Sequence, residues 1–331
     1  METTFECLLV TQETDGSFQT TLARKRIDEL PAGEVLIRVR YSSLNYKDAL
    51  SASGNRGVTR QYPHTPGIDA AGVIEASSHG DWQVGDEVIV TGFDLGMNTS
   101  GGLSQYIRVP AQWLVRRPES LSLKESMSYG TAGFTAGLSV AALLRSGIRP
   151  EQGPVVVTGA TGGVGSIAVA ILERLGYPVT AVSSKAEAHA FLTRLGASEI
   201  IPRTELEDTS GKALLKPRFA GAIDTVGGSV LATLVKSVQY GGVVTCCGMV
   251  NGGELPLTVF PFILRGVQLL GIDSVEYPIE SRSEIWKHLS GDWKPADLPS
   301  LTREITLAEV PAVLETILKG HMQGRALVRI D

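Results

Sequence analysis

The chain has few cysteines, few histidines and no long apolar run. Only three of its 331 residues are cysteine and five are histidine. An odd number of cysteines does not suggest a disulfide framework, and the adjacent Cys246 and Cys247 lie in an apolar run, as buried reduced thiols do. The histidines lack the spacing of metal ligands. No stretch of about 18 apolar residues is present, so we expect no membrane-spanning segment.

An excess of charge of one sign is also absent. The 30 Lys and Arg residues nearly balance the 35 Asp and Glu residues, and the formal net charge is −5 at pH 7. This balance argues against general binding of nucleic acid. Residues 1–7 are acidic and lack the basic and apolar regions of a signal peptide, so we expect a cytoplasmic protein. With this length and 43% hydrophobic residues, we expect two globular domains.

Glycine, by contrast, is abundant, with 37 residues, and it marks the most informative segment. Residues 155–165 read VVVTGATGGVG, so that three β-branched residues run into a glycine-rich turn. Apolar residues then follow with the spacing of one buried helical face. A strand, a tight turn and a helix N-terminus in this order turn backbone N–H groups toward a pyrophosphate. We therefore predict a dinucleotide site that includes Thr161, Gly162, Gly163 and Val164. The alternative is a doubly wound sheet that binds another phosphate ligand, or none.

The residues after the next expected strand indicate which dinucleotide binds. That strand, at 179–182, is followed by Ser183, Ser184 and Lys185. A protein that prefers NAD usually has Asp or Glu near this point, to hold the ribose 2′-hydroxyl. Two hydroxyls and a cation suit a 2′-phosphate instead, which predicts NADPH. The alternative is that Lys185 is an ordinary solvated residue at the start of a helix.

The order of the elements indicates two domains of different type. Up to about residue 120 the chain reads as short strands broken by glycine, at 34–41, 67–75, 84–90, 101–109 and 113–115, which is typical of a small barrel. A helical region at 127–144 then leads into alternating strands and helices. A closing strand at 324–330 is expected to return to the first domain. We predict an α/β fold, with a β-barrel domain of residues 1–122 and 265–331 and a doubly wound parallel-sheet domain of residues 123–264.

Three further segments narrow this interpretation: SSLNYKDAL at 42–50, YGTAGFTA at 129–136, and PFILR at 261–265 with GIDS at 271–274. With them, the whole chain resembles the medium-chain dehydrogenase/reductase superfamily, in which a GroES-like barrel is joined to a Rossmann domain. The segments are similar to its zinc-free, quinone-oxidoreductase-like branch of the YhdH/AcuI type. The resemblance implies an NADPH-dependent reductase of acryloyl-CoA.

The resemblance also implies that no metal is bound. Alcohol dehydrogenases of the superfamily take zinc ligands from a Cys-x-x-Asp segment and a Gly-His-Glu segment. The matching segments are 45–48 and 67–69, where Asn45 and Ile68 replace the Cys and the His. Neither residue offers a thiolate or an imidazole. Without a metal to polarise an alcohol oxygen, the expected reaction is hydride transfer to an already activated acceptor.

The remaining site residues also come from the resemblance. Tyr46 is expected beside the nicotinamide ribose, as a cofactor contact and a candidate donor to the substrate; the alternative is a core tyrosine. Asn45 is a candidate donor to the developing enolate, and Asp48 a candidate for holding neighbouring groups, although both residue types also stabilise turns. We thus predict these three residues as catalytic. Arg203 is expected to reach the 2′-phosphate, and further cofactor contacts are expected from Met249, Ile263 and Ser274. A methionine at position 249 suits packing equally well.

The expected partner is an acyl-CoA thioester. Lys47, Arg56 and Arg60 are candidates for its phosphates, although a solvated charged loop explains them more simply. Residues 259–271 are apolar for a loop followed by an edge strand, which predicts a homodimer.

The predicted function is therefore NADPH-dependent reduction of the C=C bond of an unsaturated acyl thioester, with acryloyl-CoA giving propanoyl-CoA. One alternative is a reductase of quinones or other activated alkenes. Another is a non-catalytic NADPH-binding protein, as the lens crystallins of the superfamily are. The residues do not determine acyl-chain length or the proton donor.

Overall fold

The alternating strands and helices after residue 150 form a parallel sheet in the computed structural model, which describes residues 4–331. Contacts within the chain define two units. Unit 1 contains the chain up to Thr131 together with Ser274–Ser290 and Asp297–Asp331, and unit 2 contains Ala132–Asp273 and Gly291–Ala296. The boundaries predicted before residues 123 and 265 lie earlier in the chain than these two divisions.

Unit 2 contains six strands and most of the predicted helices. Its strands are β8 (Val155–Val157), β9 (Val179–Val182), β10 (Glu199–Ile201), β11 (Phe219–Asp224), β12 (Val238–Cys246) and β13 (Gln268–Gly271). Its helices are α3 (Gly163–Arg174), α4 (His189–Arg194), α5 (Gly228–Ser237) and α6 (Phe260–Arg265). The strand order is β10-β9-β8-β11-β12-β13, and every pairing is parallel. The order therefore reverses between β8 and β11, which is where doubly wound sheets bind their ligands.

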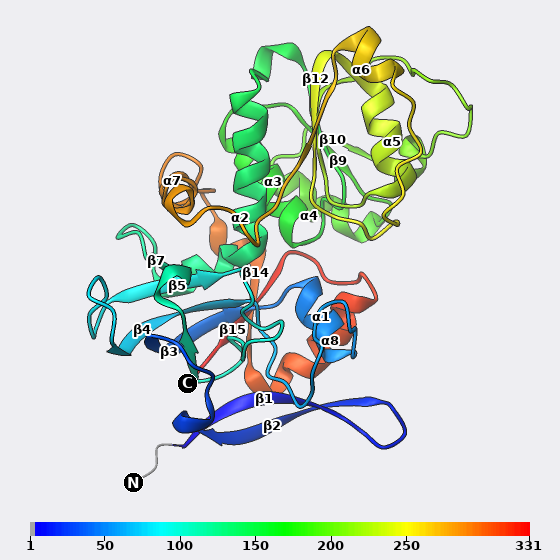
Figure 1. The fold of residues 1–331 in the computed structure, drawn as a ribbon. Helices are drawn as coiled ribbons and strands as arrows, with labels where there is room; N and C mark the ends of the chain where they lie inside the picture. The colour runs from blue at the N-terminus through cyan, green and yellow to red at the C-terminus, as the bar shows by residue number, and fades with distance from the viewer. Residues whose placement is uncertain (1–3) are drawn as a thin grey trace. The chain divides into compact units, whose positions relative to one another are not determined.

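The packing on the sheet of unit 2 explains its sequence. Helix α3 packs against β8 and β9, and α5 against β11 and β12, on opposite faces of the sheet (Figure 1). Because both faces are covered, the central strands are apolar throughout rather than alternating. The three valines of β8 are fully buried. This arrangement confirms the doubly wound sheet expected from the sequence.

Unit 1 is built mainly on antiparallel strands, with one parallel pairing, between β14 and β15. A seven-stranded sheet has the order β14-β15-β3-β4-β5-β7, with β6 paired to β3, and a separate two-stranded ribbon is formed by β1 and β2. The strands are β1 (Thr4–Gln12), β2 (Phe18–Arg26), β3 (Val35–Ser43), β4 (Asp69–Ser77), β5 (Glu87–Thr91), β6 (Tyr106–Val109), β7 (Leu114–Arg116), β14 (Thr302–Thr306) and β15 (Arg325–Arg329). The helices are α1 (Tyr46–Ala52), α7 (Ile279–Ser290) and α8 (Val310–Leu318).

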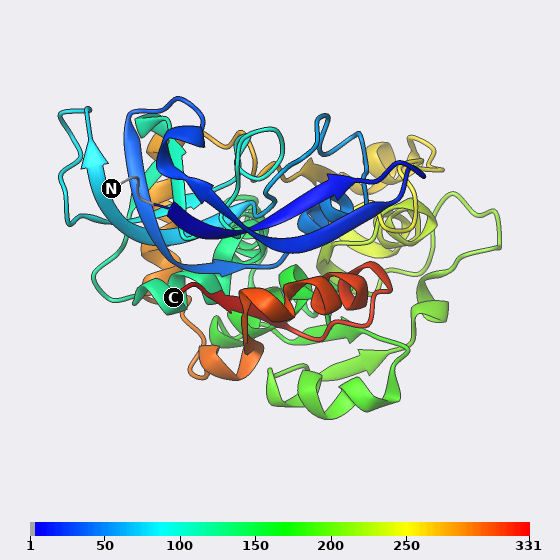
Figure 2. The same ribbon diagram turned by 90° about the horizontal axis from the view of Figure 1, so that it is seen from below.

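The predicted strands of unit 1 are present, and the alternation in β3 has the expected cause. Val35, Ile37 and Val39 are buried in the core while Arg38 is exposed. The closing strand β15 does return to this unit, where it pairs with β3 and β14. The β1–β2 ribbon, blue in Figure 2, was not predicted. Most residues of β2 are exposed or half-buried, so its sequence carries no regular apolar alternation.

The region predicted to be helical at 127–144 is one long helix, α2 (Leu123–Arg145), with a kink at Gly130. By length and composition α2 is the one described helix that could cross a membrane, but most of it is buried within the protein, as in the core helix of a globular protein. Helix α2 contains no long uninterrupted apolar run, because Gly, Ser and Thr are interspersed among its apolar residues.

Gly130 is expected to tolerate no side chain. Its backbone, at φ 52° and ψ −154°, is in a region that almost only glycine adopts, and an added Cβ would lie 2.3 Å from Asp69 Oδ2 and 2.4 Å from Ser43 Oγ. We expect Gly130→Ala to lower the free energy of unfolding by about 3 kcal/mol or more, as measured by urea titration.

Gly147→Ala is the matched control for this prediction. Gly147 also has a positive φ (83°), but the described residues place no atom within 4 Å of an added Cβ. Its expected loss is only the backbone term of about 1–2 kcal/mol. Equal losses for the two variants would contradict the crowding at Gly130.

Candidate functional site

The glycine-rich turn of unit 2 has the geometry of a phosphate cradle. Gly159 follows β8 with a φ of 56°, and Gly162 is the N-cap residue of α3. A Cβ on Gly165 would lie 2.3 Å from the carbonyl oxygen of Gly159, so only glycine lets the helix approach the turn this closely. Because Gly162 has no side chain to cap the helix, the first N–H groups of α3 are open to an anion. The predicted residues Thr161–Val164 lie here, and their binding role stays a prediction.

A buried carboxylate fixes the start of this turn through hydrogen bonds. Asp224, at the end of β11, accepts hydrogen bonds from Thr158 Oγ1 and from the Gly227 N–H, both at 2.7 Å. Burial raises the pKa of Asp224 above its ordinary value, while these two donors lower it. Thr225 in turn donates from N–H to Thr158 Oγ1. The network ties together the loops that follow β8 and β11, the two strands at the reversal of strand order.

The residues predicted for the 2′-phosphate meet at the carboxyl ends of β9 and β10. Ser184 Oγ accepts from the Arg203 N–H at 3.0 Å, and Ser183 Oγ accepts from the Lys185 N–H at 3.2 Å. The Arg203 side chain is 46% exposed and forms an ion pair with Glu207, Nε to Oε1 at 3.0 Å. The structure thus brings Ser184 and Arg203 together, as a phosphate site needs.

The other predicted cofactor residues are not part of these hydrogen bonds. Met249 and Ile263 are 71% and 72% exposed, on the loop after β12 and on α6. Ser274 belongs to unit 1, where its carbonyl oxygen accepts from Arg282 Nη2 at 3.0 Å. No contact in the structure assigns these three residues a ligand, and their role stays a prediction.

In unit 1, the predicted catalytic residues belong to a buried polar cluster. The carboxylate of Asp69 accepts from Ser43 Oγ (2.6 Å), from Asn45 Nδ2 (2.8 Å) and from both N–H and Oγ1 of Thr131 (2.9 and 2.6 Å to Oδ1). Arg325, which is 3% exposed, lies 3.5 Å from Asp69 Oδ2 and donates to the Leu44 carbonyl and to Asn45 Oδ1. The Asn45 amide is therefore engaged within the cluster at both ends.

Asp48 is the second buried carboxyl group of this cluster. It accepts from the Ile68 N–H at 2.9 Å and from the Asn45 N–H at 2.8 Å. Burial, and then the nearby charge of Asp69, raise the pKa of Asp48 to about 7. Tyr46 begins α1 and is 44% exposed, so it is not a core tyrosine. The cluster holds Asn45 and Asp48 in place and leaves the Tyr46 side chain accessible.

The cations considered for a CoA ester differ in their contacts. Arg56 donates to Gln12 Oε1 and to the carbonyl of Arg60, and its guanidinium lies 5.0 Å from the ring centre of Tyr62. It therefore fixes a loop, which favours the simpler reading of this residue. The side chains of Lys47 and Arg60 have no ion pair or hydrogen bond with residues 4–331.

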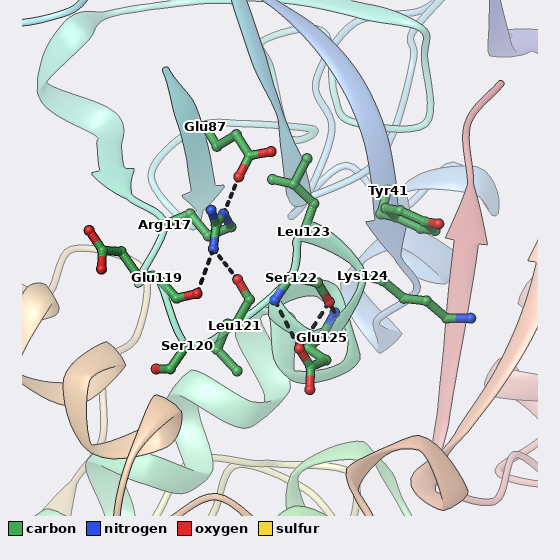
Figure 3. A pocket seen from close by; sticks show the side chains of 10 residues that line it. All are labelled: Tyr41, Glu87, Arg117, Glu119, Ser120, Leu121, Ser122, Leu123, Lys124 and Glu125. Carbon is green, nitrogen blue, oxygen red and sulfur yellow. Dashed lines mark hydrogen bonds and ion pairs between the residues drawn. The ribbon is translucent and has the colours of Figure 1, made fainter. Parts of the chain in front are cut away.

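A surface hollow of unit 1 lies at the start of α2 (Figure 3). Arg117, on one side, donates to Glu87 and to the carbonyl of Leu121. On another side, Glu125 accepts from the Ser122 N–H and hydroxyl, which closes the N-terminus of the helix. These polar groups form hydrogen bonds with one another, and we assign the hollow no ligand.

Known proteins resemble the chain over both units. Residues 31–119 match the alcohol dehydrogenase GroES-like domain, and residues 163–290 match the zinc-binding dehydrogenase family. The putative quinone oxidoreductase YhfP of Bacillus subtilis is 50% identical over 92% of each chain, and the acrylyl-CoA reductase AcuI of Ruegeria pomeroyi is 44% identical over 99% of each.

Solved structures give the same relationship. The yhdH oxidoreductase of Salmonella enterica in complex with NADP matches with a TM-score of 0.96 and 46% identity, over 98% of this chain and all of the other. Bacillus subtilis yhfP with NAD bound matches with a TM-score of 0.96 and 47% identity, over 99% of this chain and all of the other. The chain belongs to the medium-chain dehydrogenase/reductase superfamily, and it has the GroES-like and Rossmann domains of that superfamily.

The buried cluster does not fit the zinc that the family description names. The amide of Asn45 and the side chain of Ile68 stand at the matching ligand positions, and neither is a usual zinc ligand. The Asp69 carboxylate is already occupied by several donors, and the Arg325 cation at 3.5 Å would repel a second cation. Across residues 4–331, no group of three or more His, Cys, Asp or Glu side chains is arranged to hold a metal ion.

Sequence reasoning missed the partners that hold the predicted residues. Arg325 is the clearest case, because a charged residue that begins an apolar strand is a signal of a buried ion pair. Asp69 was noticed only as part of the segment that matches a zinc-ligand motif. Thr131 lies within the segment 129–136 that carried the resemblance, but nothing in that segment indicated its contact with Asp69.

The raised pKa of Asp48 predicts how stability depends on pH. Between about pH 4 and pH 7 the folded chain keeps a proton that the unfolded chain has released, so stability falls as pH rises through this range, by at most about 1.4 kcal/mol per unit. Relative to Asp48→Asn, the wild type should lose free energy of unfolding from about pH 5 to 7 and then run parallel above about pH 8.

Urea titrations across this range, followed by circular dichroism, measure the difference. A constant offset between the two proteins is also expected, because an amide leaves one of the two N–H donors without an acceptor. An offset that does not change with pH would contradict a titrating Asp48.

Proposed function

We propose that this protein reduces the C=C bond of an α,β-unsaturated acyl thioester with NADPH, and that acryloyl-CoA is its substrate. The observation that carries the proposal is the buried cluster of unit 1, where an asparagine and an arginine–aspartate pair stand in the region where zinc enzymes of the superfamily hold their metal. Support also comes from relatives at 44–45% identity over nearly their full length that are named acrylyl-CoA reductase.

The reaction asks little covalent chemistry of the protein. NADPH supplies a hydride to the β-carbon, and a proton adds to the α-carbon as negative charge on the thioester oxygen disappears. The protein must orient the two reactants and place donors where the charge develops. We propose that Tyr46 makes a cofactor contact and is the candidate donor, because its side chain is accessible. Asn45 and Asp48 then act by holding the start of α1 in place.

The proposed binding surface for NADPH is the carboxyl edge of the unit 2 sheet. The open N-terminus of α3 would receive the pyrophosphate, and Ser183, Ser184, Lys185 and Arg203 would receive the 2′-phosphate. Recognition of a ribose 2′-hydroxyl by an acidic side chain is not available at 183–185, where no Asp or Glu is present. The structures of yhdH are described with NADP or NADPH bound, which supports this choice of cofactor.

A quinone reductase is the second candidate. YhfP, at 50% identity, carries the name putative quinone oxidoreductase. Such a reaction would use the same hydride and would equally need no metal. We further propose a cytoplasmic location, because the three cysteines are free and such thiols persist in a reducing compartment.

Parallel assays of NADPH oxidation with acryloyl-CoA, crotonyl-CoA and a quinone test the proposal. We expect kcat/KM for acryloyl-CoA to exceed that for the quinone by at least about 100-fold, because only the thioester is matched by a site built for an enolate oxygen. Fast turnover of the quinone with neither thioester would show the second candidate to be right. Tight binding of NADPH without any turnover would indicate a non-catalytic protein.

We also propose that the protein is a homodimer formed through unit 2. Strand β13 is an edge strand of the sheet. Just before it, Val259, Phe260, Ile263 and Leu264 are between 48% and 72% exposed. An apolar segment beside an unpaired strand edge favours association across a two-fold axis.

Light scattering after gel filtration tests the dimer. At micromolar concentration we expect the mass of two chains for the wild type and of one chain for the double variant Phe260→Asp/Ile263→Asp, because two buried carboxylates would oppose association. Val84→Asp, at another apolar residue that is 70% exposed, is the matched control and should stay dimeric. A monomeric wild type would contradict the proposal.

A further inference from the structure

Arg203 makes three contacts at the carboxyl edge of the unit 2 sheet. Its backbone N–H donates to Ser184 Oγ at 3.0 Å. In its guanidinium, Nε lies 3.0 Å from Glu207 Oε1, and Nη2 donates to Asn251 Oδ1 at 2.5 Å. Its Nη1 has no hydrogen bond or ion pair with residues 4–331. Because a guanidinium has five N–H donors, the fork formed by Nη1 and Nη2 keeps donors for a ligand.

Asn251 is itself firmly placed. Its N–H donates to the carbonyl of Val226 at 2.8 Å, and its Nδ2 donates to Ser229 Oγ at 3.2 Å. Gly228, with a φ of 60°, allows this close approach, since an added Cβ there would lie 2.4 Å from the carbonyl oxygen of Asn251. The side-chain oxygen that meets Arg203 is therefore a fixed acceptor on a loop anchored to the start of α5.

The hydrogen bond between these two side chains joins opposite sides of the strand-order reversal. Arg203 follows β10, and Asn251 follows β12. In the sheet, β10 lies on one side of the β8–β11 pair and β12 on the other. A doubly wound sheet binds a dinucleotide at this reversal. The two residues thus connect the expected 2′-phosphate end of the site with the loop that carries Met249.

We propose that Asn251 is a specificity-determining residue that selects NADPH over NADH by orienting the Arg203 guanidinium. The inference rests on the proposed function, which supplies the cofactor. Glu207 and Asn251 occupy Nε and one donor of Nη2, and the remaining fork is turned to the 2′-phosphate, which it can bind through two parallel hydrogen bonds. NADH has no 2′-phosphate and gains nothing from this arrangement.

The residue type at 251 suits this role. A half-exposed arginine loses side-chain freedom when it binds a phosphate, and a fixed acceptor reduces that loss in advance. A carboxylate would hold the guanidinium equally well, but it would bring a second negative charge beside that of Glu207 and repel the phosphate. The neutral amide oxygen of Asn251 orients Arg203 without this repulsion.

Dissociation constants for NADPH and NADH, measured by titration calorimetry on the full-length protein, test the proposal. We expect Asn251→Ala to weaken NADPH about fivefold to tenfold and to leave NADH within about twofold, the effect of one hydrogen bond to a charged group in a partly exposed site. Arg203→Ala should weaken NADPH by about 30-fold or more. The double variant should match Arg203→Ala, because Asn251 acts through Arg203.

Ser229→Ala is the intermediate variant, since it removes the partner of Asn251 Nδ2 and loosens this side chain, but keeps the Oδ1 that accepts from Arg203. Its loss of NADPH affinity should be smaller than that of Asn251→Ala, and melting temperatures show that each variant folds. Equal losses of NADPH and NADH in Asn251→Ala, or losses that add in the double variant, would overturn the role of Asn251 alone. A wild type that binds NADH as tightly as NADPH would contradict the proposed cofactor and this inference with it.

Discussion

A single buried guanidinium opposite two buried carboxyl groups governs the site of unit 1. A carboxylate removed from water is stable only where donors or an opposite charge surround it. Arg325 and several hydrogen-bond donors meet this need for Asp69. Asp48 accepts from two backbone N–H groups, but its burial, and then the nearby charge of Asp69, still raise its pKa. The same crowding explains Gly130, because Asp69, Ser43 and Arg325 fill the space where its side chain would be.

A buried carboxylate also needs donors in unit 2, but there the donors fix loops around an open binding surface. Asp224 is buried and satisfied by Thr158 and Gly227, so the loops after β8 and β11 are held before any ligand arrives. The donors that remain open are the first N–H groups of α3 and part of the Arg203 guanidinium. Both favour anions. A site prepared in this way loses less entropy on binding, which is the advantage of fixing its loops through buried polar groups.

The features that could be predicted from the sequence are those set by residues close together in the chain. The order of strand, glycine turn and helix at 155–175 is a local pattern, and β8, α3 and β9 follow it closely. The replacement of zinc ligands at Asn45 and Ile68 could also be read from single positions. The partners of these residues could not be predicted, because Arg325 reaches Asn45 and Asp69 only through the pairing of β15 with β3. A polar loop residue such as Asn251 gives no sign of its contact until the loops are placed in space.

The fold of the backbone does not determine which cofactor binds. The relatives with NADP and with NAD bound match this chain equally well, so the selection must depend on a few side chains at the ends of the strands. Here Glu207, which follows β10, forms an ion pair with Arg203 and is thereby less able to accept from a ribose hydroxyl. The buried cluster around Asp69 and Arg325 belongs to unit 1 and contains none of these strand-end residues. The cluster at the former zinc-ligand positions and the side chains at the ends of β9 and β10 are therefore different residues, so a change in one set need not alter the other.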